Sequence, residues 1–155
     1  MADRDRDERG RARNARPRDE LGRPLPRDAA GAYVEEALPD DPEALLRMGI
    51  EHFNAQRFFQ AHETWETAWH AASEDERDFW QGITQIAVGC THVQRDNPRG
   101  AMTLLRRGAD RIAPYGATHR GLPVASLAAD ARALADQIER DGLQPELRWP
   151  SIAFV

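Results

Sequence analysis

Apolar residues recur at intervals of three and four along most of the chain, which is the spacing of one face of an α-helix. The clearest stripe lies on residues 124–138, and a second one, on residues 102–112, follows Asn97 and Pro98. We see no strand-like alternation of useful length and no internal repeat. The pattern therefore predicts an all-α fold, a single helical bundle of about five or six helices.

Residues typical of helix starts and ends predict where these helices begin and end. Asp41-Pro42 and Asn97-Pro98 are each typical of a helix start with an N-cap residue, and Ser73 to Glu76 has the pattern of a capping box. The residues from Pro145 onward predict an irregular strap whose Trp149 and Phe154 pack on the bundle. The expected helices span about 42–54, 58–72, 74–95, 98–112 and 124–138.

The first 28 residues differ from the rest, because they are rich in Arg, Asp and Pro and hold almost no large apolar side chain. Such a segment buries too little apolar surface to offset the entropy of ordering. We therefore expect a disordered tail over 1–28 and a helical bundle domain over 29–155. The tail fits either a solubilising extension or an electrostatic tether to a partner.

Composition narrows the classes of function. The formal net charge is −5 and the sequence pI is about 5.5, so no nucleic-acid partner is expected. The only cysteine, Cys90, lies on an apolar stripe, which excludes an internal disulfide and is typical of a reducing compartment. The longest uncharged stretch, residues 80–94, is too short and too polar to span a bilayer. These features predict a cytoplasmic protein without membrane contact.

Two neighbouring helices carry the candidate chemistry. On the helix expected over 74–95, Gln81, Gln85 and His92 share the side opposite the apolar stripe. No charge interrupts residues 80–94, and a helix without a charged face is usually buried on most sides. We therefore expect this polar stripe to be buried and to need hydrogen-bonding partners.

The preceding helix can supply those partners. His62 and Glu66 share one of its faces, and a short turn joins the two helices, so they should pack antiparallel. We expect His62 and Glu66 to converge with Gln81, Gln85 and His92 in one buried polar cluster, which His52 could also approach.

Three interpretations of this cluster remain open. It could be a hydrogen-bond network that fixes helix register, a contact within a homo-oligomer, or a site for a small ligand or metal. In the metal case His62, Glu66 and His92 would hold Zn²⁺ or Mn²⁺, and Glu63 would be the general base of a hydrolase. His62-Glu63-Thr64-Trp65-Glu66 departs from the metalloprotease H-E-x-x-H pattern at its last position. We favour a binding or structural role towards a small ligand or protein partner, because the sequence supplies no substrate pocket or complete ligand set.

Three blocks of sequence resemble a known family. They are FN at 53–54 with FFQAHE at 58–63, FWQGITQIAV at 79–88, and His92 with RDNPRGA at 95–101. In this order they resemble the domain-of-unknown-function 309 family over about residues 45–112. Asp96 stands where that family commonly has glycine, a departure confined to a turn.

The resemblance implies a small all-helical protein without an established activity, one at times described as a predicted metal-dependent hydrolase. Carried over residue by residue, it implies that the family's polar positions are His62, Glu63, Glu66, Gln81, Gln85, His92 and Asn97.

Overall fold

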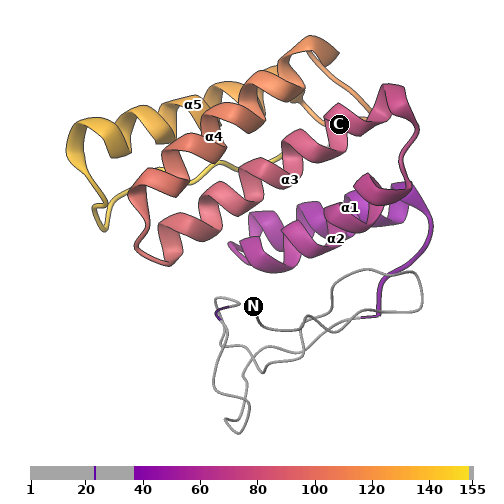
Figure 1. The fold of residues 1–155 in the computed structure, drawn as a ribbon, viewed down its shortest axis with the longest axis horizontal. Coiled ribbons are helices and arrows are strands. Elements are labelled where there is room, and N and C mark those ends of the chain that lie inside the picture. The colour runs from indigo at the N-terminus through magenta and orange to yellow at the C-terminus, as the bar shows by residue number, and fades with distance from the viewer. Residues whose placement is uncertain (1–22, 24–36, 154–155) are drawn as a thin grey trace, which may run out of the picture. The chain divides into compact units, whose positions relative to one another are not determined.

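The computed structural model describes residue 23 and residues 37–153. In this part the chain forms five α-helices, one 3-10 turn and no strand, so the predicted all-α bundle is confirmed (Figure 1). The predicted tail lies outside the described residues except for Arg23, and the domain boundary near residue 29 stays a prediction. The elements are α1 Pro42–Asn54, α2 Phe58–Ala71, α3 Glu74–Gln94, α4 Pro98–Ile112, η1 Ala113–Tyr115 and α5 Val124–Asp141.

Two of the three expected helix caps form. Asp41 Oδ2 accepts a hydrogen bond from the Ala44 amide at 3.1 Å, and Asn97 Oδ1 accepts one from the Gly100 amide at 3.1 Å. Ser73 is the N-cap residue of α3, but its side chain makes no capping bond, so the predicted capping box is wrong. The carboxylate of Glu76, which would complete the box, is hydrogen-bonded to other residues instead.

Each α-helix packs against the next one along the chain, and α3 and α4 share the most extensive contact (Figure 1). The predicted apolar stripe of α3 is confirmed, since Phe79, Ile83, Ile86 and Cys90 are fully buried. Burial raises the pKa of the Cys90 thiol well above its usual range, so this cysteine is chemically inert. None of the helices in the described residues combines the length and hydropathy needed to cross a membrane.

The helical hairpins α1–α2 and α3–α4 resemble each other at an offset of 40 residues. The helix ends match at that offset: α1 ends at 54 and α2 begins at 58, while α3 ends at 94 and α4 begins at 98. In each hairpin a buried glycine of the first helix lies against a large residue of the second. A Cβ on Gly49 would lie 2.0 Å from Nε1 of Trp65, and one on Gly89 would lie 2.8 Å from Cγ of Leu105.

The turns inside the two hairpins are built alike. Gln56 and Asp96 both adopt left-handed backbone conformations, with φ of 60° and 59°. In each turn the backbone carbonyl of a histidine accepts the amide five residues on at 2.8 Å, from Arg57 to His52 and from Asn97 to His92. Side chains repeat this link, because Arg57 Nε donates to His52 Nδ1 at 2.9 Å and Asn97 Nδ2 donates to His92 Nδ1 at 3.1 Å.

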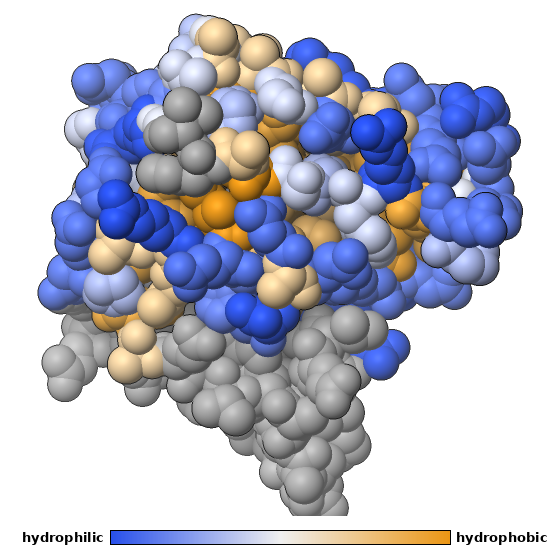
Figure 2. Space-filling view, turned by 180° about the vertical axis from the view of Figure 1, so that it is seen from behind, coloured by the Kyte–Doolittle hydropathy of each residue, from blue (hydrophilic) through white to orange (hydrophobic). Residues whose placement is uncertain are grey.

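After α5 the chain forms an irregular segment, residues 143–153, which we call the strap. It runs back behind α4 and α3 (Figure 1). The predicted packing of Trp149 is confirmed, since its ring lies 5.0 Å from that of Phe58 at the start of α2. Phe154 lies outside the described residues. On the face opposite to that of Figure 1, apolar side chains gather near the centre with polar side chains around them (Figure 2).

Candidate functional site

A row of three side chains, His62, Glu66 and His70, lies along one face of α2 and is called here the α2 row. His62 Nε2 lies 3.1 Å from Glu66 Oε2, and His70 Nε2 lies 3.2 Å from Glu66 Oε1. Hydrogen bonding by His62 is the main reason why the pKa of Glu66 falls from 4.5 to about 2, against the opposing effect of burial. The predicted association of His62 with Glu66 therefore exists, but it is a contact within one helix.

The two ring nitrogens of His62 both face oxygen atoms that only accept hydrogen bonds. Nδ1 lies 2.8 Å from the carbonyl oxygen of Phe59, and Nε2 faces the Glu66 carboxylate. Both bonds form together only when the ring carries two protons, so the pair with Glu66 is then an ion pair. The ring of His70 is stacked on Trp69 with centroids 5.1 Å apart.

Gln85 points to α4 rather than to α2. Its Oε1 accepts a hydrogen bond from Arg111 Nε at 3.2 Å, and Arg111 NH1 donates to Asp78 Oδ1 at 2.8 Å. The close approach of α4 to Gly82 explains this direction, because it brings Arg111 beside the same side of α3. Gln81, on that side too, is half-buried.

His92 belongs to the turn between α3 and α4. Its Nδ1 accepts from Asn97, whose Oδ1 caps α4. Partial burial, and then the nearby charge of Arg95, lower the pKa of His92. His52, the equivalent residue of the first hairpin, is buried and accepts a hydrogen bond from Arg57 Nε.

The expectation of one buried polar cluster is therefore wrong in two respects. The five residues His62, Glu66, Gln81, Gln85 and His92 are half-buried rather than buried. Within residues 37–153, no hydrogen bond joins His62 or Glu66 to Gln85 or His92, because the partners of the last two lie on α4 and in the α3–α4 turn. A helical-wheel argument gives the direction of a side chain but not the helix that it meets.

The described residues do not fit the expected metal site. Among them, no group of three or more His, Cys, Asp or Glu side chains could hold a metal ion. Both carboxylate oxygens of Glu66 already face imidazoles, and Nδ1 of His92 faces Asn97. Glu63, the expected general base, is half-buried on α2 and has an interaction of its own.

Sequence reasoning missed a cluster that ties the α4–α5 connection to α3 and α1. Glu76 Oε2 lies 2.5 Å from His119 Nε2, and its Oε1 accepts from Arg120 Nε at 2.8 Å. Arg120 NH1 also lies 2.8 Å from Glu43 on α1. Partial burial acts to raise the pKa of Glu76, but the hydrogen bonds from His119 and Arg120 bring it below its usual value. His119 is thus half-buried and paired with Glu76.

The signal for this cluster was the dipeptide Arg120-Gly121. Both residues have positive φ, 52° and 79°, and His119 and Leu122 exchange two backbone hydrogen bonds of 3.0 and 2.9 Å across them. This is the geometry of a tight turn that normally favours Asn-Gly. Arginine in this strained position is explained by its contacts with Glu76 and Glu43.

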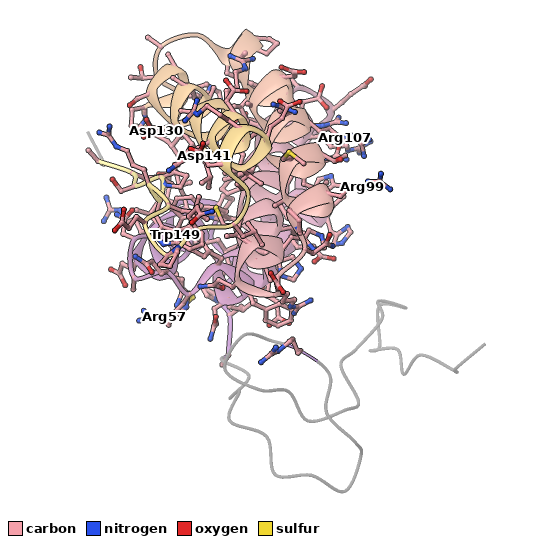
Figure 3. All side chains as sticks on the ribbon, turned by 90° about the vertical axis from the view of Figure 1, so that its left-hand side faces the viewer. Arg57, Arg99, Arg107, Asp130, Asp141 and Trp149 are labelled. Carbon is pink, nitrogen blue, oxygen red and sulfur yellow. The ribbon has the colours of Figure 1, made fainter. Side chains whose placement is uncertain are left out.

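A second missed site is the place where the strap is held, defined here as the strap seat: Asn54, Phe58 and Gln137. Asn54 Nδ2 donates to the carbonyl oxygen of Ile152 at 2.8 Å, and Asn54 Oδ1 accepts from the Ile152 amide at 2.7 Å. Trp149, which Figure 3 shows on the strap, packs on Phe58. Gln137 Oε1 accepts from the Arg148 amide at 3.3 Å.

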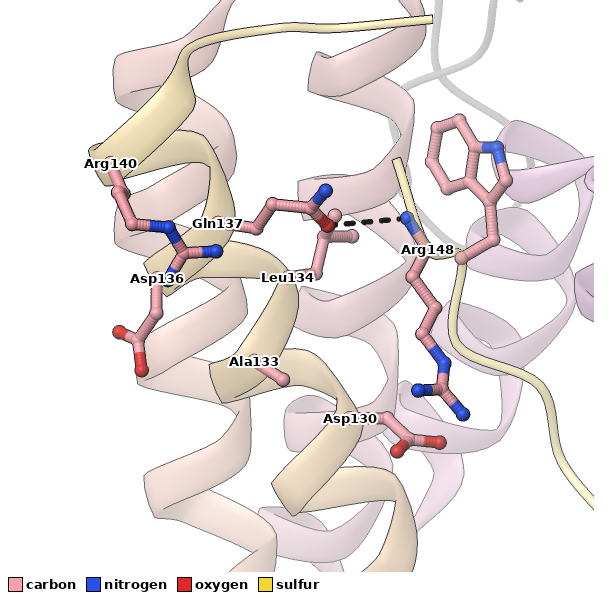
Figure 4. Close-up of a pocket in the computed structure, with 8 residues that line it drawn as sticks. Asp130, Ala133, Leu134, Asp136, Gln137, Arg140 and Arg148 are labelled. Carbon is pink, nitrogen blue, oxygen red and sulfur yellow. Dashed lines mark hydrogen bonds between the residues drawn. The ribbon is translucent and has the colours of Figure 1, made fainter. Parts of the chain in front are cut away.

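A pocket of about 410 Å³ lies between α5 and the strap (Figure 4). Its lining includes Leu134 and Trp149 together with the charged side chains of Asp130, Arg140 and Arg148. The size is within the range of small-ligand pockets, but four of its eight lining residues are charged, two acidic and two basic.

Comparison with known proteins supports the sequence resemblance. Residues 46–104 match the family model described as Domain of unknown function (DUF309). The predicted resemblance is thereby confirmed over α1 to the middle of α4, within the expected range of 45–112. No curated protein matches the chain.

Proposed function

We propose that this chain is a binding protein that holds an irregular peptide segment on its strap seat, and that it is not an enzyme. The observation that carries this proposal is the pair of hydrogen bonds between Asn54 and Ile152, 2.8 and 2.7 Å long. The metal-dependent hydrolase that remained open from the sequence receives no support from the arrangement of His62, Glu66 and His92.

A side-chain amide carries both a donor and an acceptor, so it can pair with the N–H and the C=O of one residue of another segment. This contact recognises backbone, in the same way that a neighbouring strand would, and does not depend on the side chain of the bound residue. Asn54 is the last residue of α1, so its backbone is held by the helix while its side chain is presented to the segment. The seat is therefore built before the segment arrives.

Apolar contacts add affinity to this backbone contact. Ile152 is only 3% exposed, and the ring of Trp149 lies tilted at 31° to that of Phe58. Phe58 is itself fixed by an edge-on contact with Phe53, with centroids 5.0 Å apart. Rigid aromatic anchors of this kind commonly dominate the energy of peptide and protein interfaces.

The double-hairpin fold suits such a role. Stacked helical hairpins form a regular surface to which a segment can be laid, as in longer repeat proteins. Here α1 to α5 pack in chain order, and residues of α1, α2 and α5 contact the strap.

A peptide added in trans tests the proposal. The full-length variant Trp149→Ala should lose about 1–3 kcal/mol, because a half-buried tryptophan contributes less than the 3–5 kcal/mol of a buried one. A synthetic peptide with the sequence of residues 143–153 should then raise the melting temperature in a saturable manner, since a ligand that binds the folded state stabilises it.

Asn54 provides the matched control. Asn54→Asp retains the acceptor for the Ile152 amide but loses the donor to its carbonyl, at almost unchanged volume. In the double variant Asn54→Asp, Trp149→Ala the peptide should have little or no effect. If the peptide at millimolar concentration leaves the folded Trp149→Ala variant unchanged, the strap seat is not a binding site and the proposal is wrong.

A further inference from the structure

We infer that the strap is a resident competitor for the strap seat, and that the partner displacing it carries a segment of the same pattern: a basic residue, an aromatic residue, proline, any residue, then an aliphatic residue. This inference rests on the proposed function. It adds the kind of partner and the means by which the free protein is kept from binding non-specifically.

Burial along the strap gives the pattern. Pro150 and Ile152 are buried, whereas Ser151 and Ala153 between and after them are exposed. Alternation with a period of two is typical of an extended chain with one face on a surface. Pro150 has no amide hydrogen to leave unpaired, so it can be buried at little cost. The positions equivalent to 149, 150 and 152 therefore select the partner, and 151 is free to vary.

Charge supplies the basic position. The side chain of Arg148 extends from the strap towards Asp130 of α5 (Figure 4). Asp136 and Arg140 also line the pocket, but Asp136 is paired with Arg106 at 2.9 Å, so Asp130 is the carboxylate available to a basic residue at this position. A segment with a basic residue just before its aromatic residue is favoured there over one with an acidic residue.

The strap is attached in a way that permits exchange. Between α5 and Trp149 its described hydrogen bonds are a local one, from Gln144 Nε2 to the carbonyl of Asp141 at 2.7 Å, and the single bond to Gln137. The pocket of about 410 Å³ separates this part of the strap from α5. Gly142, with φ of 74°, ends α5 at the point where the strap leaves it. The bonds to Asn54 and the ring contact with Phe58 lie at the far end, while Leu143 and Leu147 are only partly buried against the core. Loss of the far-end contacts can therefore free the strap while α5 stays in place.

A tethered competitor lowers the apparent affinity of every external ligand, in proportion to the fraction of molecules whose strap seat is open. The strap is connected to α5 by a short segment, for which the effective concentration is on the order of millimolar. Partners that bind only weakly are therefore excluded, and a partner must match the pattern well to displace the strap.

Fluorescence anisotropy with a labelled peptide of residues 143–153 tests the inference on full-length proteins. The Trp149→Ala variant, whose own strap is weakened, should bind this peptide at least tenfold more tightly than the wild type. Equal affinity of the two proteins would show that the strap is not a competitor.

A panel of substituted peptides, measured on the Trp149→Ala protein, tests the pattern. Trp149→Ala or Ile152→Asp in the peptide should weaken binding by tenfold or more, and Arg148→Glu should weaken it less. Ser151→Ala should leave the affinity unchanged. Equal binding of all these peptides would overturn the pattern while leaving the proposed function standing, whereas failure of every peptide to bind would overturn both.

Discussion

Replacing Gly108 by alanine tests the close packing of the backbones of α3 and α4. A Cβ at this position would lie 2.6 Å from the carbonyl oxygen of Gly82 and 3.0 Å from the amide nitrogen of Ile86. Carbon–oxygen contacts between packed helices are about 3.3 Å or longer, so α4 would have to move by roughly 0.7 Å. Because these neighbours are backbone atoms, no change of rotamer can relieve the clash.

Two opposing effects set the magnitude. Alanine improves helix propensity over glycine by about 1 kcal/mol. Forcing extra volume into a packed contact costs typically 1–3 kcal/mol, and more where the backbone must shift. Moving α4 also loosens the contact of Gly89 with Leu105 one layer away. We expect a net loss of about 1–2 kcal/mol, which lowers the melting temperature by roughly 3–8 °C.

Thermal and urea unfolding, followed by circular dichroism, measure this loss. Thr103→Ala is the matched control, because Thr103 lies on the exposed side of the same helix and its loss should change stability by less than about 0.5 kcal/mol. If Gly108→Ala instead raises the melting temperature, helix propensity alone is at work. The close approach of α3 and α4 would then be wrong.

Three other predictions concern the polar groups. Hydrogen bonding by His62 lowers the pKa of Glu66 from 4.5 to about 2, so the stabilisation that ionised Glu66 gives the fold is present above pH 4.5 and is lost towards pH 2. The melting temperature of Glu66→Gln should therefore change less with pH in that window than that of the wild type, and parallel curves would contradict this. Arg120→Gly should be less destabilised than Arg120→Ala, since φ of 52° favours glycine; the reverse order in urea unfolding would contradict the strained turn. Zn²⁺ or Mn²⁺ should not stabilise the wild type relative to His62→Ala, because the described residues form no group of three ligands; saturable stabilisation with about one metal per chain by elemental analysis would revive the metal interpretation.

Helix positions and the core followed from the sequence because their causes are local. The Asp41 and Asn97 caps and the apolar stripe of α3 each depend on residues within one or two turns of helix. Where a cap competes with a long-range partner, the local signal fails. Glu76 has the position of a capping-box residue, yet its carboxylate is hydrogen-bonded to His119, 43 residues away.

The similarity of the two hairpins is not visible in the sequence, because equivalent positions in them carry different side chains. Trp65 in the first hairpin corresponds to Leu105 in the second, and Ile50 corresponds to Cys90. Both pairs are buried, so the hairpins conserve burial rather than chemistry. Only the small residues and the histidine of the turn are nearly the same in both, and such a short set is visible only when the structure aligns it.

Only part of the candidate site was predicted, because only contacts within one helix follow from the local sequence. His62 and Glu66 meet as their spacing within one helix indicates. The partner of Gln85 could not be predicted, since it depends on how closely α4 approaches α3 at Gly82 and Gly108. The strap seat was out of reach, because Asn54 and Ile152 are 98 residues apart and neither belongs to a recognisable motif.

Comparing equivalent positions of the two hairpins indicates which polar residues the fold itself needs. His92 has an equivalent in His52, and both receive a side-chain hydrogen bond from the residue five positions on. A residue that both hairpins need in the same role is explained by the turn, so His92 requires no ligand to account for it. His62 corresponds to Met102 and Glu66 to Arg106 by the same offset.

Asn54, the residue that binds the strap, corresponds to Gln94, whose amide donates instead to the carbonyl of Gln56 at 2.9 Å. The two hairpins thus use a side-chain amide at the same place: Gln94 links α3 to the turn of the first hairpin, and Asn54 holds the strap. The strap also packs on the first hairpin through Trp149, whose ring lies 5.0 Å from that of Phe58. The difference between the two hairpins therefore falls on the strap seat, the site of the proposed binding role.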